Sequence, residues 1–145
     1  MANQSTTGFG LRPLRKVGQT DNNAGLGDFQ IASGASAIYH NDPVLLAATG
    51  YITIGVAGPV VNYVGSLNGV FYTDPTTSKP TWKNYWPSVA VEADALVNSD
   101  PQQMFEIRTA SATPGRASIG GTADIATYVA GAAPNYISRI TMSGT

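Results

Sequence analysis

The chain contains no cysteine, and this absence removes several kinds of site at once. Disulfide bonds, thiolate nucleophiles and cysteine-based zinc sites are all excluded. The chain therefore needs no oxidising compartment. Its 145 residues suggest a single domain that is large enough to bury a sizeable core.

Charge is also scarce. Charged residues make up 12% of the chain, about half of the roughly 25% usual in soluble domains. A surface so poor in charge is covered either by uncharged polar groups or by partners, which favours an assembled protein. The net charge of −1 gives no general attraction to nucleic acid. Three of the eight cations lie within the first twenty residues and no acid precedes Asp21, so the remainder carries a net charge of −4.

Long apolar runs are missing as well. No run approaches the roughly 20 residues that span a bilayer, and the first residues have neither the basic start nor the apolar core of a signal peptide. We therefore expect the protein to be made in a cytoplasm and to have no contact with a membrane.

Helix signals are few, and strand signals dominate. Strand-forming segments recur every eight to twelve residues, with Gly and Pro between them, which is typical of a sandwich or small barrel. The best helix candidate is residues 123–129, and glycines keep it short. The sequence predicts an all-β fold: a small β-barrel or β-sandwich with an extended N-terminal arm and at most one short helix. Residues 1–20 are predicted to form the arm and residues 21–145 a single β domain. The clearest predicted strands are residues 44–48, 51–57, 60–64, 89–94, 104–109 and 136–142.

The arm combines apolar and basic residues. Pro13 disfavours a central strand there and favours an extended arm or an edge strand. Apolar side chains can anchor such a segment on a partner while its cations pair with acidic groups. Because the rest of the chain is acidic, the arm can instead fold back onto its own or a neighbouring subunit, and a solvated tail is a third possibility. The residues predicted to dock are Phe9, Leu11, Arg12, Leu14, Arg15 and Lys16.

Candidates for chemistry are weak. His40, the only histidine, is predicted to be a turn residue bonded to Asp42 or to the backbone, since no metal-ligand set accompanies it. Glu92 and Asp94 share a strand face at a spacing of two, which is more typical of solvated carboxylates than of a glycosidase pair. Residues 21–28 offer oxygen ligands for calcium but lack EF-hand spacing. We predict no catalytic residue, no cofactor and no metal site, and we expect the chain not to be an enzyme.

Residues 68–87 are the most distinctive stretch. Two aromatic-rich segments flank a connector that contains Pro75 and Pro80, and large aromatics around a rigid turn bury much apolar area. We expect this unit to form core or a subunit interface, with Phe71, Trp82, Tyr85 and Trp86 largely buried. The two lysines beside it are too few to follow the phosphate backbone of a nucleic acid. Carbohydrate binding, with sugar rings stacked on the aromatic side chains, is an alternative role for the unit. The residues of the unit are Phe71, Tyr72, Trp82, Tyr85 and Trp86.

Five stretches are distinctive when they are taken together: residues 7–15, 29–34, 37–45, 69–87 and 100–108. Together they resemble small virion proteins of tailed bacteriophages, especially marine and cyanobacterial ones. The similarity is specific in residues 69–87 and looser in the other four stretches. Beyond residue 109 no resemblance is evident.

The resemblance implies a capsid cement, or head decoration, protein. Such proteins commonly bind as homotrimers on the outside of the head and hold neighbouring capsomers of the major capsid protein together against internal DNA pressure. The implied location is the capsid surface of the virion, without direct contact with nucleic acid. The family offers no catalytic motif to carry over. The alternative function is a carbohydrate- or receptor-binding β module of a phage particle.

Overall fold

The computed structural model describes residues 8–18, 25–56, 62–110 and 115–143, and within these ranges the regular structure is β strands and one short 3-10 turn. The predicted all-β class is therefore confirmed. In chain order the elements are β1 (Arg12–Lys16), β2 (Leu26–Ile31), β3 (Pro43–Leu46), β4 (Ile52–Ile54), β5 (Tyr63–Thr73), β6 (Pro80–Lys83), β7 (Ala93–Asn98), β8 (Gln103–Glu106), β9 (Arg108–Thr109), η1 (Arg116–Ser118), β10 (Ile125–Thr127) and β11 (Thr141–Met142).

The central sheet is organised around β5, the longest strand. Its strand order is β2-β7-β5-β3-β4, and β6 pairs with the far part of β5. All of these pairings are antiparallel. One edge of β5 runs along β7, while its other edge pairs first with β3 and then with β6. The described sheets do not close into a barrel, which fits a β-sandwich.

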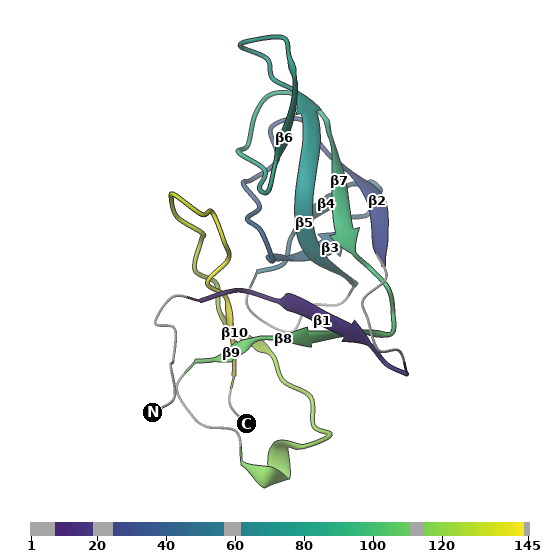
Figure 1. The fold of residues 1–145 in the computed structure, drawn as a ribbon, viewed down its shortest axis with the longest axis vertical. Coiled ribbons are helices and arrows are strands. Elements are labelled where there is room, and N and C mark those ends of the chain that lie inside the picture. The colour runs from purple at the N-terminus through teal and green to yellow at the C-terminus, as the bar shows by residue number, and fades with distance from the viewer. Residues whose placement is uncertain (1–7, 19–24, 57–61, 111–114, 144–145) are drawn as a thin grey trace.

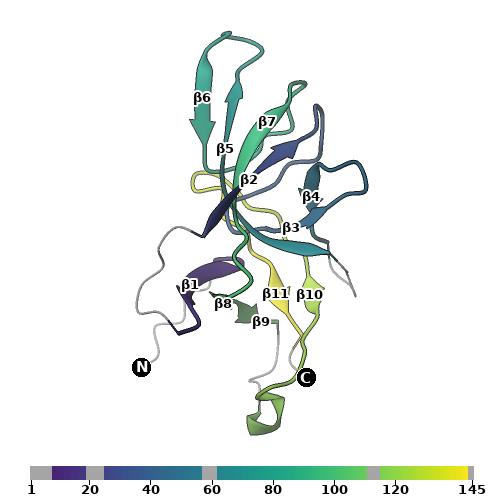
Figure 2. The same ribbon diagram turned by 90° about the vertical axis from the view of Figure 1, so that its right-hand side faces the viewer.

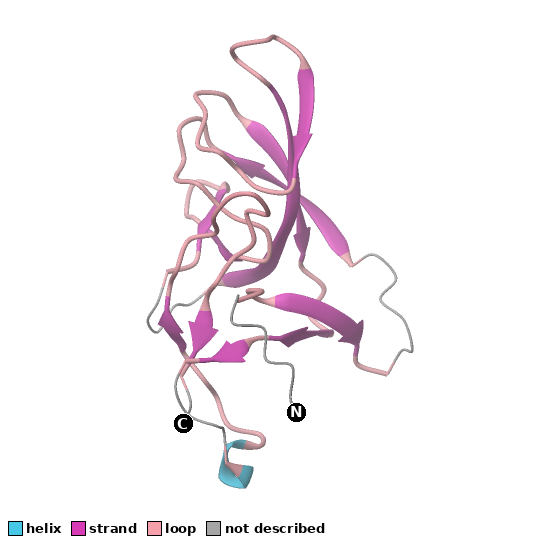
Figure 3. Ribbon diagram, turned by 60° about the vertical axis from the view of Figure 1, so that its left-hand side comes forward, coloured by secondary structure: helices cyan, strands magenta, loops and turns pink. Residues whose placement is uncertain are grey.

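The elements are spread between two ends of the molecule. The β5–β6 hairpin projects at one end, and β1, β8 and the small β9–β11 sheet lie at the other (Figures 1 and 2). The two-stranded sheet β1-β8 and the three-stranded sheet β10-β11-β9 are separate from the central one. Figure 3 shows η1 beyond the small sheets, at the end opposite the hairpin.

The hydrophobic core lies on one face of the central sheet. Alternate residues of β7 are buried, because successive side chains of a strand point to opposite faces. Trp86 is the largest fully buried side chain. The other core residues are Ile31, Ile38, Val44, Ile52, Leu67, Val70, Tyr72, Ala93, Ala95 and Val97.

Several predicted elements differ from those observed. The helix expected at residues 123–129 is wrong, because Ile125–Thr127 form strand β10, which pairs with β11. β-Branched residues between glycines suit an edge strand better than a helix of under two turns. The strand expected at residues 89–94 lies instead at Ala93–Asn98. Residues 104–109 divide between β8 and β9, which belong to different sheets. Residues 57–61, predicted to end one strand and begin another, lie outside the described residues.

Candidate functional site

The described part of the N-terminal arm lies against its own chain. The Leu11 N–H donates to the carbonyl of Asn41 (2.8 Å), and the Asn41 amide donates to the carbonyl of Phe9 (3.0 Å). Gly10 is buried, and a Cβ there would come within 2.6 Å of Ser138. Strand β1 then pairs antiparallel with β8, with a bulge between Pro13 and Arg15. Residues 8–17 therefore fold back onto their own subunit, which was one of the three possibilities for the arm. Pro13 lies in an edge strand, as expected.

Two of the three arm cations are paired within the chain. Arg12 forms an ion pair with Glu106 of β8, and its guanidinium lies 4.8 Å from the centre of the Phe9 ring. Lys16 pairs with Asp100 at 2.6 Å, with both side chains mostly buried. This pairing helps to hold the pKa of Asp100 below its usual value. No described residue forms an ion pair with Arg15.

The β1–β8 sheet presents an apolar surface. The exposed fraction is 48% for Leu14, 61% for Val17 and 40% for Met104. The exposed Arg15 lies between Leu14 and Val17 in sequence and is paired with Met104 across β1 and β8. Phe9 and Leu11 are only half-buried. Of the six residues predicted to dock, Leu14 and Arg15 are exposed, and Arg15 has no ion-pair partner among the described residues, so a partner could contact both. We call Leu14, Arg15, Val17 and Met104 the arm surface.

The inner part of the aromatic unit is core, as predicted for Trp86 and Tyr72. Trp86 is completely buried, and its ring meets that of Tyr72 edge-on at 5.5 Å. The indole N–H donates to the carbonyl of Ala35 (3.1 Å), so its polar atom is satisfied. Half-buried Tyr85 stacks on Tyr136 at 4.0 Å, which fastens the C-terminal segment to the unit.

The outer part of the unit is not buried in this chain. Phe71 and Trp82 are each 50% exposed, so the expectation that both are largely buried is wrong for the isolated subunit. The physical reason is the pleat: Phe71 precedes core residue Tyr72 and must point to the opposite face. Trp82 is paired directly with Phe71 across β5 and β6, so it shares that face.

His40 and Asp42 occupy a buried turn between the arm and the central sheet. As predicted for a turn histidine, His40 Nδ1 hydrogen-bonds to a backbone group, the carbonyl of Asn68, at 2.8 Å. Asp42 is fully buried and accepts from the Tyr39 N–H (2.8 Å) and from the Tyr128 hydroxyl (3.4 Å). Its second oxygen, Oδ1, has no hydrogen-bond partner among the described residues.

Burial decides the ionisation of Asp42. The loss of solvent around the carboxyl raises its pKa to about 6, although hydrogen bonds from Ser138, Tyr39 and Tyr128 act in the opposite direction. Burial next to this carboxyl also raises the pKa of the Tyr128 hydroxyl. The contacts of Asp42 hold its turn against Tyr39 and Tyr128, which gives the carboxyl a structural and pH-dependent role.

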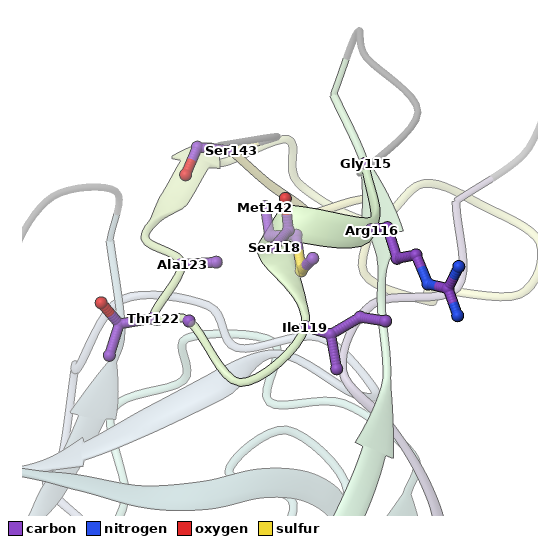
Figure 4. A pocket seen from close by; sticks show the side chains of 9 residues that line it. Gly115, Arg116, Ser118, Ile119, Thr122, Ala123, Met142 and Ser143 are labelled. Atoms are coloured by element: carbon purple, nitrogen blue, oxygen red, sulfur yellow. The ribbon is translucent and has the colours of Figure 1, made fainter.

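A hollow of about 290 Å³ lies at the arm end of the molecule, between η1 and β11. Its described lining contains Arg116, three hydroxyl residues and Met142, but no imidazole or carboxylate. Figure 4 shows the Arg116 side chain directed away from the others.

No group of three metal-ligating side chains occurs among the described residues. Residues 21–24 of the segment considered for calcium lie outside them. Glu92 and Asp94 are both exposed, as expected, and the Tyr51 hydroxyl donates to Glu92 at 2.8 Å. The part of the chain that the structure describes has no helix with the length and apolar character needed to cross a membrane.

Sequence reasoning missed two functional features. It did not identify the exposure of Phe71 and Trp82, although the adjacency of Phe71 and Tyr72 implies that only one of them faces the core. It treated His40 as the notable group of its turn, whereas Asp42 is the residue whose pKa is shifted.

Comparison with known proteins adds no further assignment: no family model, no curated protein and no solved structure matches this chain.

Proposed function

We propose that this chain is a structural virion protein that binds the outside of a bacteriophage head and cements neighbouring capsomers of the major capsid protein. The observation that carries the proposal is the arm surface, a set of apolar residues around a cation without an ion-pair partner among the described residues. A shell with acidic groups between apolar patches would match it. The low charge and the resemblance of residues 69–87 to phage virion proteins support the same function.

The arm surface is suited to docking because it is held rigidly. Backbone pairing holds β1 on β8 before any partner binds, and the Arg12–Glu106 pair and the Lys16–Asp100 pair, the latter to the turn before β8, add to it. Binding then needs little further ordering of the backbone, which is a main cost of association. The surface lies at the end opposite the β5–β6 hairpin, so a docked molecule would present its hairpin away from the shell (Figure 1).

Binding to phage heads tests the arm surface. The double variant Leu14→Asp with Arg15→Glu is expected to lose at least tenfold in affinity for heads, because it removes an apolar contact and reverses the cation. Co-sedimentation with purified heads that lack this protein measures the effect. Lys79→Glu, an equal charge reversal at the far hairpin, is the control and should bind normally. Equal binding by all three proteins would contradict docking through the arm surface.

We further propose that the chain acts as a homotrimer, because three-fold symmetry matches the sites between capsomers and a charge-poor surface can pack without desolvating ions. Light scattering of the purified protein is expected to give three times the chain mass of 15.1 kDa. The trimer would be excluded by two results together. The first is a mass of one chain in solution at micromolar concentration, and the second is a copy number of one chain per binding site on heads, measured by mass spectrometry.

A further inference from the structure

Four side chains form a straight row across the outer face of the central sheet. In register, Trp82 of β6 lies opposite Phe71 of β5, Phe71 lies opposite Asp94 of β7, and Asp94 lies opposite Gln30 of β2. Directly paired residues place their side chains on the same face. All four are exposed. The row therefore passes from two aromatic rings to a carboxylate and then to an amide.

An open hollow of about 300 Å³ lies beside this row, at the hairpin end of the sheet. Gln30, Phe71, Thr73, Glu92 and Asp94 contribute to its lining. This size falls at the lower end of the range usual for small-ligand sites. The Tyr51 hydroxyl, which donates to Glu92 at 2.8 Å, holds that carboxylate in place on the rim.

The aromatic side of the row is pre-arranged. A Cβ at Gly69 would come within 2.3 Å of the Trp82 ring, so the indole lies against the strand where glycine leaves room for it. Packing against β5 restricts the rotation of Trp82 while half of its surface stays exposed. A restricted Trp82 ring and a Glu92 carboxylate held by Tyr51 reduce the ordering cost of binding a small ligand.

We propose that this face binds a neutral saccharide. The apolar C–H face of a sugar ring in the hollow can pack on Phe71, while its hydroxyls donate to Asp94 and Glu92 and exchange hydrogen bonds with Gln30. Trp82 lies one strand further along the row, where it can stack on the next ring of an oligosaccharide. Hydrogen bonds to carboxylates are stronger than those between neutral groups. The inference is independent of the capsid-binding function, because the arm surface lies at the other end of the molecule.

Charge distinguishes a saccharide from other occupants. Glu92 and Asp94 form no ion pair with a described residue, and Asp28 adds a third carboxylate to the same face. Lys83 lies on the opposite face, with its ammonium 5.9 Å from the centre of the Tyr72 ring. A second copy of the chain placed face to face here would bury these unpaired carboxylates at high cost. An anionic ligand would be repelled, whereas a neutral sugar meets neither obstacle.

Tryptophan fluorescence tests the proposal directly. The chain has two tryptophans, and only Trp82 is exposed, since Trp86 is fully buried. Titration with glucose, galactose, N-acetylglucosamine and linear oligomers of each is expected to give a saturable change with at least one of them. Trp82→Phe should remove the fluorescence change. By calorimetry, Asp94→Ala and Phe71→Ala should each weaken binding at least tenfold.

Controls separate loss of the site from loss of the fold. Each variant should keep the wild-type circular dichroism spectrum and unfold cooperatively, and Glu106→Ala, which changes a carboxylate at the arm end, should bind the sugar normally. Head binding should be unchanged in Asp94→Ala, which distinguishes failure here from failure of the capsid function. The proposal is overturned if no probe binds at millimolar concentration, or if Asp94→Ala and Phe71→Ala bind as the wild type does. It is also overturned if Trp82→Ala dissociates an oligomer, because a second copy then occupies this face.

Discussion

Trp86→Ala is expected to lower the free energy of unfolding by about 3–5 kcal/mol, the usual cost of truncating a buried aromatic. Trp86 is fully buried, packs edge-on against Tyr72 and donates its indole N–H to Ala35. Its backbone also bridges Ile38 through two hydrogen bonds, of 2.7 and 3.2 Å. Alanine keeps the bridge but leaves a cavity and an unpartnered carbonyl. Urea unfolding followed by far-UV circular dichroism measures the loss.

Trp82→Ala is the matched control, since it removes the same side chain from the same unit. The exposed Trp82 ring has less apolar area to lose, so a cost of about 1 kcal/mol or less is expected, near the range of surface substitutions. Because domains are stable by only about 5–15 kcal/mol, the difference between the two variants should be large. Equal losses would mean that the core is not centred on Trp86.

Asp42→Asn is expected to remove a pH-dependent contribution to the free energy of unfolding. The Asp42 carboxyl has a pKa of about 6 in the folded chain and an ordinary value of 3.8 when exposed, so the folded state binds this proton more tightly. Between these two pH values the free energy of unfolding falls as pH rises, and above pH 6 it stays at the lower value. A difference of about two pKa units corresponds to about 3 kcal/mol at most.

The measurement is the wild-type minus variant difference in the free energy of unfolding, taken at intervals from pH 4 to pH 7.5. That difference should fall by up to about 3 kcal/mol over this range, because asparagine does not titrate. Asp74→Asn gives the opposite sign when the series is extended below pH 3.8, since backbone hydrogen bonds from Thr76 and Thr77 lower the pKa of Asp74 from that ordinary value. Its stabilising effect is present above the unfolded pKa and is lost as the pH falls. Parallel curves for the wild type and Asp42→Asn would show that Asp42 does not titrate in this range.

The all-β class was predictable from the sequence, and Pro13 limited the arm to an extended segment or an edge strand. Strand formers between Gly and Pro leave little room for helices, and Pro13 cannot donate to a central ladder. The absence of cysteine excluded thiol chemistry before any fold was known. The hairpin over residues 68–87 was also predictable, because prolines and Asp74 mark the turn between two aromatic segments.

Which face of each aromatic segment is buried became clear only from the folded chain. A strand alternates its side chains, but when Phe71 and Tyr72 are both large aromatics the sequence does not show which one meets the core. The arm is similar: its cations have acidic partners that lie far along the chain, and Glu106 is 94 positions from Arg12. Burial of Asp42 likewise depends on Tyr128 and Ser138, which only folding brings beside it. Long-range pairing, rather than local pattern, therefore set the candidate sites of this protein.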